Sequence, residues 1–193
     1  MVKLAGHKKV KTAVFISGTG SNLKSLIKFS KTTKSPISIN LIISNNPEAK
    51  GLKLGKINKI RKKVFNFKKK NKIENQILSI LKEHEIKMIC LAGFMKILSR
   101  NFITKFSGKI LNIHPSLLPK YKGLNTHQRV LNNNEKYSGC TVHFVNSKLD
   151  SGKIILQKKV RITKNETKNS LAKKILEQEH KLYPRAILKV FSL

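Results

Sequence analysis

The chain has 193 residues, of which 39% are hydrophobic, and it carries 41 lysines and arginines against 9 acidic residues, a formal net charge of +32. These values fit one domain with a buried core and exclude a fibrous or low-complexity chain. No apolar run is long enough for a signal peptide or a membrane-spanning helix, and Cys90 and Cys140 have neither disulfide-framework nor zinc-site spacing. We therefore expect a cytoplasmic protein without membrane partner or metal.

The charge has two interpretations. A nucleic-acid-binding surface is one, but only five of the basic residues are arginines, the side chain preferred for reading bases and binding phosphates. The lysines are scattered along the whole chain among many asparagines and isoleucines, as in proteins from AT-rich genomes. We expect compositional bias and no specific nucleic-acid partner, with weak attraction to polyanions at low salt.

Strands and helices alternate through the first 124 residues. Short apolar runs predict buried strands, and apolar residues at helical spacing predict helices between them. The expected strands are 12–17, 37–44, 64–67, 88–92 and 109–113, and the expected helices are 23–30, 48–60, 73–84 and a segment directly after residue 95. This order predicts an α/β fold with a mostly parallel, Rossmann-like sheet and helices on both faces.

The pattern changes after residue 124. A short helix is expected over 125–132, and then strands over 140–145 and 153–162 without a helix between them, which predicts an antiparallel carboxyl-terminal addition to the sheet. A final amphipathic helix extends past Leu171 and is expected to be interrupted near Pro184. Repeats and a second domain are absent from the pattern, so residues 1–193 are expected to form one domain.

The segment 111–124 carries the strongest functional signal. Asn112 and His114 lie two apart on an expected strand, so both side chains point to the same face, at the carboxyl edge where open α/β sheets place their sites. Asp150, in Lys-Leu-Asp-Ser-Gly, is the only aspartate in the chain. An amide, an imidazole and a carboxylate can form an oxyanion donor, a general acid/base and a group that tunes the base. The alternatives are a core histidine and a turn aspartate.

The other histidines carry weaker signals. His7, His84 and His143 are expected to have no functional role, while His127 and His180 remain possible pocket residues. None of them has the spacing of a zinc site.

Residues 18–22, Gly-Thr-Gly-Ser-Asn, lie between an expected strand and helix. Glycines there let backbone N–H groups approach an anion at the helix amino terminus. The loop lacks the Walker A and dinucleotide patterns, so a phosphate monoester is the preferred ligand, and a tight turn with a helix cap is the alternative.

Taken together, the motifs resemble those of the folate-dependent phosphoribosylglycinamide formyltransferases (GAR transformylases) of the formyltransferase superfamily. The motifs are Ile-Ser-Gly-Thr-Gly-Ser-Asn at 16–22, Leu-Ala-Gly-Phe-Met-Lys-Ile-Leu at 91–98, Leu-Asn-Ile-His-Pro-Ser-Leu-Leu-Pro-Lys at 111–120, Thr-Val-His-Phe-Val at 141–145 and Asp-Ser-Gly at 150–152. The resemblance runs in order from about residue 12 to the end of the chain.

The resemblance implies a role for each matching residue. The catalytic trio falls on Asn112, His114 and Asp150, and the substrate-phosphate loop on Gly20, Ser21, Asn22 and Leu23. The folate-binding strand and turn fall on Met95, Lys96, Ile97 and Leu98, with Asn112, and a basic folate-binding residue falls on Lys70. Glu179 matches a glutamate near the substrate amine. Thr19, Lys96 and Asn125 depart from common family residues, and Asn125 is given no catalytic role.

The implied reaction is transfer of the formyl group of 10-formyltetrahydrofolate, a co-substrate, to the amine of glycinamide ribonucleotide in de novo purine biosynthesis, without a metal. Asp150 is expected to supply a net upward shift of the pKa of His114, so that the imidazole is mostly protonated at pH 7. The alternatives are another 10-formyltetrahydrofolate-using formyltransferase, such as one acting on methionyl-tRNA, a hydrolase of the same folate, or a nonspecific nucleic-acid-binding protein. The first two would need a further carboxyl-terminal or amino-terminal domain, which we do not expect here. The oligomeric state is left open.

Overall fold

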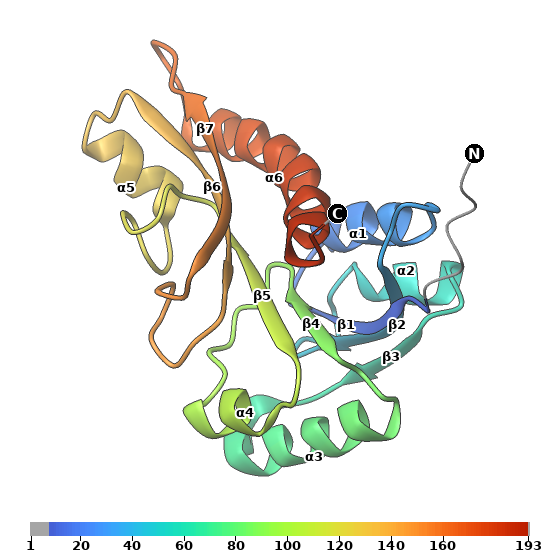
Figure 1. The fold of residues 1–193 in the computed structure, drawn as a ribbon. Helices are drawn as coiled ribbons and strands as arrows, with labels where there is room; N and C mark the ends of the chain where they lie inside the picture. The colour runs from blue at the N-terminus through green and yellow to red at the C-terminus, as the bar shows by residue number, and fades with distance from the viewer. Residues whose placement is uncertain (1–7, 193) are drawn as a thin grey trace, which may run out of the picture.

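The fold is built on one seven-stranded sheet with helices on both faces (Figure 1). The computed structural model describes residues 8–192. The strands are β1 Val10–Ile16, β2 Ile37–Ser44, β3 Arg61–Val64, β4 Met88–Leu91, β5 Lys109–His114, β6 Tyr137–Phe144 and β7 Ile154–Arg161, in the order β3-β2-β1-β4-β5-β6-β7. Strands β1 to β5 pair in parallel, and β6 and β7 are antiparallel additions. The predicted fold class is confirmed.

The helices divide the core into two layers. The α-helices are α1 Ser21–Ser30, α2 Leu52–Ile57, α3 Lys70–Glu83, α4 Arg100–Lys105, α5 Thr126–Asn132 and α6 Lys168–Val190, and η1 Phe67–Lys69 is a 3-10 turn. Strand alternation sends Val14 and Ile16 into the layer under α1 and α6, and Ala13 and Phe15 into the layer under α3 and α4. No helix within residues 8–192 is both long and apolar enough to cross a bilayer.

The third strand was predicted in the wrong place. It covers Arg61–Val64 rather than residues 64–67, and all four of its residues are exposed. An edge strand needs only backbone pairing with its neighbour, here Leu41 opposite Arg61 in β2, so no apolar run marks it. The expected helix 48–60 is likewise shorter, because residues 45–51 form a loop and α2 is only Leu52–Ile57.

The expected helix directly after residue 95 is also wrong. Residues 92–99 form an irregular turn, and α4 begins only at Arg100. Ser99 caps α4 by accepting a hydrogen bond from the Phe102 N–H at 3.0 Å, and the buried Glu74 of α3 accepts hydrogen bonds from both the backbone and the hydroxyl of Ser99. The helix therefore starts where a cap exists and leaves the preceding turn free to line a cavity.

Helix α6 continues through Pro184 instead of being interrupted there. Proline lacks the N–H that would bond to the carbonyl of His180 four residues earlier. The hydroxyl of Ser25 on α1 donates to that carbonyl at 2.8 Å and satisfies it. The cost of proline inside the helix is thus offset by a contact between the two helices of the same layer.

Candidate active site

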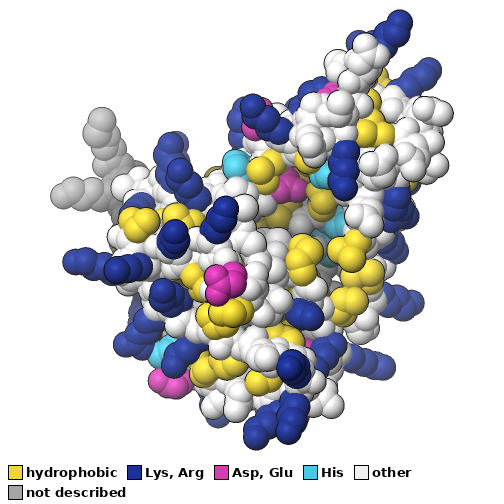
Figure 2. All heavy atoms as spheres, turned by 180° about the vertical axis from the view of Figure 1, so that it is seen from behind, with side chains coloured by type: hydrophobic (Ala, Val, Ile, Leu, Met, Phe, Trp, Pro, Cys, Tyr) yellow, Lys and Arg dark blue, Asp and Glu magenta, His cyan; other side chains and the backbone are white. Residues whose placement is uncertain are grey.

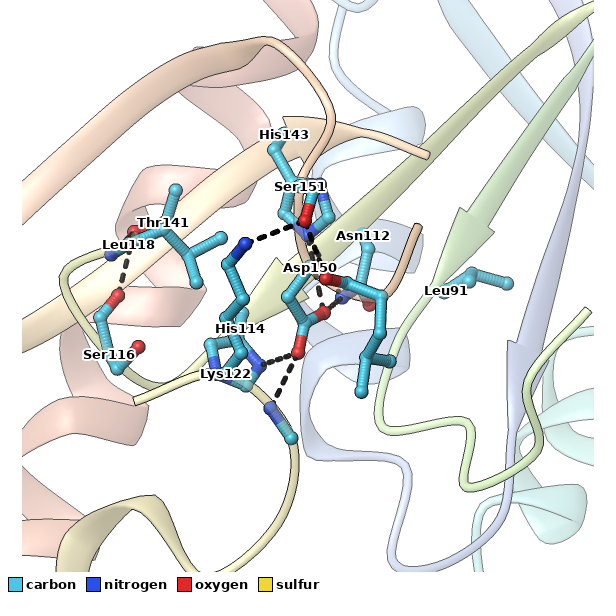
Figure 3. A network of polar contacts seen from close by, with 12 residues as sticks. Leu91, Asn112, His114, Ser116, Leu118, Lys122, Thr141, His143, Asp150 and Ser151 are labelled. Carbon is cyan, nitrogen blue, oxygen red and sulfur yellow. Dashed lines mark hydrogen bonds and ion pairs between the residues drawn. The ribbon is translucent and has the colours of Figure 1, made fainter. Parts of the chain in front are cut away.

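Three polar side chains meet at the carboxyl end of β5. Asn112 and His114 lie on the same face of that strand, and Asp150 lies in the loop between β6 and β7. The Asp150 Oδ2 atom is 3.3 Å from His114 Nδ1, and its Oδ1 atom accepts a hydrogen bond of 3.4 Å from Asn112 Nδ2. Figure 3 shows the carboxylate between the imidazole and the amide. The only aspartate of the chain therefore faces the histidine, as the resemblance implied.

The loop after β5 folds back onto this pair. The backbone carbonyl of Tyr121 lies 2.8 Å from His114 Nε2, and the N–H of Gly123 donates to Asp150 Oδ2 at 2.8 Å. Because a carbonyl oxygen can only accept, Nε2 carries the proton, and Nδ1 is the basic nitrogen of the neutral ring. The ring can donate to Asp150 through Nδ1 only once it is charged.

Burial sets the protonation state of His114. Its side chain is 7% exposed, and this desolvation lowers the pKa of the imidazole below its ordinary value, although the Tyr121 carbonyl and the Asp150 carboxylate both act to raise it. The expected net upward shift is therefore wrong, while the contribution of Asp150 itself has the expected sign. In the free protein His114 is mainly neutral at pH 7.

The pKa of Asp150 is lowered, although its carboxyl is largely buried. Burial raises the pKa of this carboxyl, but the neighbouring His143 ring, the hydrogen bond from the Gly123 N–H and the nearby His114 imidazole outweigh it and hold the pKa below its ordinary value. Asp150 is thus a carboxylate at neutral pH.

His143 belongs to the site, which the sequence analysis missed. It lies opposite Asn112 in the β5–β6 pair and is 2% exposed. Its Nδ1–H donates to the Phe144 carbonyl at 2.8 Å, so Nε2 is free to accept from Asn112 Nδ2 at 3.2 Å. The two hydrogens of the Asn112 amide are thereby directed to His143 and Asp150. Only the strand register reveals this contact.

The glycine-rich loop lies where β1 ends and α1 begins. Gly20 caps α1 with a φ of +77°, and a Cβ there would come within 2.6 Å of the Gly51 Cα. The Gly51 N–H donates to the Gly18 carbonyl at 3.0 Å, so a second loop supports the first at backbone distance. Sequence gave no sign of this role for Gly51.

The N–H groups of the first helical turn are available for a ligand. Those of Ser21, Asn22 and Leu23 have no partner within α1 itself, because the first helical bond is the one from Lys24 to Gly20. Gly20, Ser21 and Asn22 line the cavity described below, whereas the Leu23 side chain is fully buried in the core. Leu23 can therefore contribute only its backbone.

All four residues of the turn Met95–Leu98 line the same cavity. Met95 is 61% exposed and Ile97 is 62% exposed, an unusual display of apolar surface for two residues of one short turn. The hydroxyl of Ser17 accepts from the Met95 N–H at 2.7 Å and donates to the side chain of Asn45. This links the turn to the end of β1.

Glu179 on α6 is a buried carboxyl with one hydrogen-bond donor. Asn22 Nδ2 donates to its Oε2 at 2.7 Å, and the residue is 6% exposed. Burial raises the pKa of Glu179 to about 7, against a smaller lowering by the Asn22 hydrogen bond. Because the pair joins α6 to the first turn of α1, the carboxyl lies beside the glycine-rich loop.

All of these groups border one cavity of about 780 Å³, within the usual range for small-molecule sites. The glycine-rich loop, Glu179, the Asn112–His114–Asp150 trio and the Met95–Leu98 turn all line it. Figure 2 shows a hollow in which apolar, acidic and histidine side chains lie together, while lysines and arginines are spread over the surrounding face. The charge is not gathered into one patch on this face.

Comparisons with known proteins agree with this geometry. Residues 10–187 match the model of the formyl transferase family. Over 180 residues the chain is 43% identical to phosphoribosylglycinamide formyltransferase of Haemophilus influenzae, covering 92% of this chain and 85% of that protein. The crystal structure of phosphoribosylglycinamide formyltransferase from Brucella melitensis superposes with a TM-score of 0.89 at 42% identity, covering 95% of this chain and 96% of that one. The chain belongs to the phosphoribosylglycinamide formyltransferase family.

Some relatives are much longer. The human trifunctional purine biosynthetic protein adenosine-3 is 44% identical over 188 residues, but the chain spans only 19% of its length.

The remaining candidate residues divide into two groups. His127 lines the cavity and burial lowers its pKa, whereas His180 lies outside the lining residues. Lys70 begins α3 and is not among the lining residues either, so the structure does not bring it to the site. Within residues 8–192 no group of three or more His, Cys, Asp and Glu side chains could hold a metal ion.

Proposed function

We propose that this chain transfers the formyl group of 10-formyltetrahydrofolate to the amine of glycinamide ribonucleotide, a step of de novo purine biosynthesis. The observation that carries the proposal is the set of groups that line one cavity: an anion-binding loop, a buried carboxyl, the polar trio and an apolar turn. Relatives named phosphoribosylglycinamide formyltransferase support it. The other activities of the trifunctional relatives are not proposed for this chain.

The phosphate of glycinamide ribonucleotide is assigned to the glycine-rich loop. Unpaired N–H groups and the helix dipole favour an anion there, and the contact between Gly20 and Gly51 fixes the backbone that presents them. With the phosphate bound at this loop, Glu179 is the nearest carboxyl that can accept a hydrogen bond from the substrate amine.

The formyl donor is assigned to the part of the cavity that the Met95–Leu98 turn lines. A pterin is flat and partly apolar, and the exposed Met95 and Ile97 offer an apolar wall beside the polar trio. Backbone groups of the Met95–Leu98 turn can bind the pterin edge. Lys70 stays a prediction from the resemblance, and a contact with the charged folate tail would need its side chain to reach the cavity mouth.

Asn112, His114 and Asp150 are assigned the transfer of the proton and the stabilisation of the charges that form during the reaction. Attack of an amine on a formyl carbon puts negative charge on the formyl oxygen and leaves an excess proton on the nitrogen. Neutral His114 accepts that proton at Nδ1, and the imidazolium so formed is held by the Asp150 carboxylate at 3.3 Å. The imidazolium then gives the proton to the departing folate nitrogen as the bond between that nitrogen and the formyl carbon breaks, which releases tetrahydrofolate and leaves the formyl group on the substrate amine. Asn112 can give up its long hydrogen bond of 3.4 Å to Asp150 and donate that hydrogen to the formyl oxygen instead.

The Glu179→Gln variant is expected to gain stability above pH 7. The folded-state pKa of about 7 lies above the ordinary 4.5, so the native protein binds this proton more tightly than the unfolded chain does. The Glu179 carboxyl makes its full contribution to the free energy of unfolding below pH 4.5. That contribution is lost as the pH rises through 7, which lowers the free energy of unfolding by about 3 kcal/mol at higher pH. In urea unfolding, the variant should have a larger free energy of unfolding than the wild type at pH 8 and nearly the same value at pH 4.5. An equal difference at both pH values would contradict the assignment.

The same variant should bind glycinamide ribonucleotide less well. Loss of a carboxylate that receives an amine raises the KM for that substrate by roughly 10- to 100-fold. The KM for the folate should be unchanged, which distinguishes a local loss from general damage.

Incubation with both substrates tests the proposed function. We expect tetrahydrofolate to be released only when glycinamide ribonucleotide is present. Release without the ribonucleotide would indicate a hydrolase, and no release together with tight, salt-resistant RNA binding would indicate a nucleic-acid-binding protein.

We further propose that residues 1–193 act as one formyltransferase domain in the cytoplasm. One sheet and its two core layers run through residues 10–190. The two cysteines are free and buried, which suits a reducing compartment.

A further inference from the structure

Tyr121 has a backbone conformation that tyrosine rarely adopts. Its φ is +57°, in the left-handed region, where an aromatic side chain is disfavoured. Such a conformation persists only when surrounding contacts hold it. The residue belongs to the loop after β5, between the strand that carries His114 and α5.

The side chain of Tyr121 is anchored from one side. Its hydroxyl donates to Glu135 Oε1 at 2.8 Å and accepts from Asn133 Nδ2 at 3.0 Å. The Arg129 guanidinium lies 5.5 Å from the ring centroid, and its Nη1 donates to the Lys122 carbonyl at 2.7 Å. All three anchors lie on α5 or just after it, away from the cavity.

The backbone of the same turn holds two members of the trio. The Tyr121 carbonyl accepts from His114 Nε2 at 2.8 Å, and two residues later the Gly123 N–H donates to Asp150 Oδ2 at 2.8 Å. One bond fixes the tautomer of the imidazole, and the other fixes the carboxylate that faces it. Tyr121 itself is not among the residues that line the cavity.

We propose that Tyr121 is a positioning residue whose anchored side chain holds the 121–123 turn so that it presents a carbonyl to His114 and an N–H to Asp150. The inference rests on the proposed function for its kinetic consequences alone. Its structural part concerns the free protein and can be tested without turnover.

The pKa of His114 reports the position of this turn. Charged or titratable groups face the imidazole from each neighbouring element: Asp150 from the β6–β7 loop, His143 from β6, and Arg129 and His127 from α5. The bond to the Tyr121 carbonyl raises the pKa of His114, so a displaced carbonyl lowers that pKa further while these groups stay in place.

The experiment is an NMR titration of the His114 ring in the Tyr121→Phe variant. The ring signal is assigned by its absence from the spectrum of His114→Ala. Phenylalanine keeps the ring under Arg129 but loses both hydroxyl bonds, so we expect a lower His114 pKa than in the wild type. In the transfer assay kcat should fall about three- to tenfold with the KM of both substrates retained.

Glu135 provides an independent route to the same turn. Glu135→Leu removes the acceptor of the Tyr121 hydroxyl and should reproduce both effects, while Glu135→Gln keeps an acceptor oxygen and should restore most of the wild-type values. The effects of Tyr121→Phe and Glu135→Leu should add to less than their sum in the double variant, because both changes break the hydrogen bond between the Tyr121 hydroxyl and Glu135.

Tyr137→Phe is the matched control. Tyr137 lies on β6 and is 42% exposed, and its ring packs under Lys159. Within residues 8–192 its hydroxyl makes no hydrogen bond to the turn, so removal of that hydroxyl should leave the His114 titration and kcat unchanged. Folded Tyr121→Phe and Glu135→Leu variants with wild-type His114 titration would overturn the inference, whatever the outcome of the transfer assay. If either variant does not fold, the titration of the other decides.

Discussion

The His114→Ala variant is expected to lose a factor of about 10²–10⁴ in kcat while its KM for each substrate stays within a few fold. The imidazole is the strongest base of the trio at neutral pH, because the lowered pKa of Asp150 makes its carboxylate a weak base and the Asn112 amide does not titrate. Binding is retained because the groups assigned to the two substrates, the loop at Gly20 and the Met95–Leu98 turn, do not include His114.

Steady-state kinetics with each substrate varied in turn measure this effect. His84→Ala is the matched control, since His84 ends α3 and does not line the cavity. Asn112→Ala should lower kcat by a similar factor, because the oxyanion then lacks its hydrogen-bond donor. Turnover within threefold of wild type in His114→Ala would remove the residue from the mechanism.

For Asp150→Asn we expect a lower kcat and an acidic limb of the pH–rate profile that moves to lower pH. His114 must be neutral to accept a proton, so activity is lost as the pH falls through its pKa. The Asp150 charge raises that pKa, and its removal lowers it. Asparagine tolerates the φ of +45° at this position and can still accept from the Gly123 N–H, so the loop should keep its shape.

The loss in kcat for Asp150→Asn should be about 10- to 100-fold, because the imidazolium loses its counter-ion. The profile of kcat/KM between pH 5 and 9 measures both effects. Asn112→Ala leaves Asp150 beside His114, so its acidic limb should stay near that of the wild type. An acidic limb that does not move in Asp150→Asn would make the carboxylate a structural group of the turn.

The buried parts of the fold could be predicted from sequence, and the exposed parts could not. The strand at 37–44 was predicted with its observed bounds because it is mostly buried and its buried residues are mostly apolar. The exposed β3 and the turn after β4 gave no such signal. That turn is held by the Ser17 hydroxyl, 78 residues away from Met95, a contact that local pattern does not encode.

The site shows the same division. Alternation along a strand placed Asn112 and His114 on one face, but only resemblance linked them to Asp150. His143, Tyr121 and Gly51 were missed because each acts through strand register or backbone approach rather than through a motif. The direction of the His114 pKa was wrong because the extent of its burial is a property of the folded cavity.

The most direct test follows the transferred carbon itself. The protein is incubated with glycinamide ribonucleotide and 10-formyltetrahydrofolate labelled with ¹³C in the formyl group, and the label is followed by ¹³C NMR. We predict that it moves to the amide carbon of the formylated ribonucleotide, and that His114→Ala slows the transfer by about 10²–10⁴. Label that remains on the folate, or appears only as free formate, would contradict formyl transfer by this site.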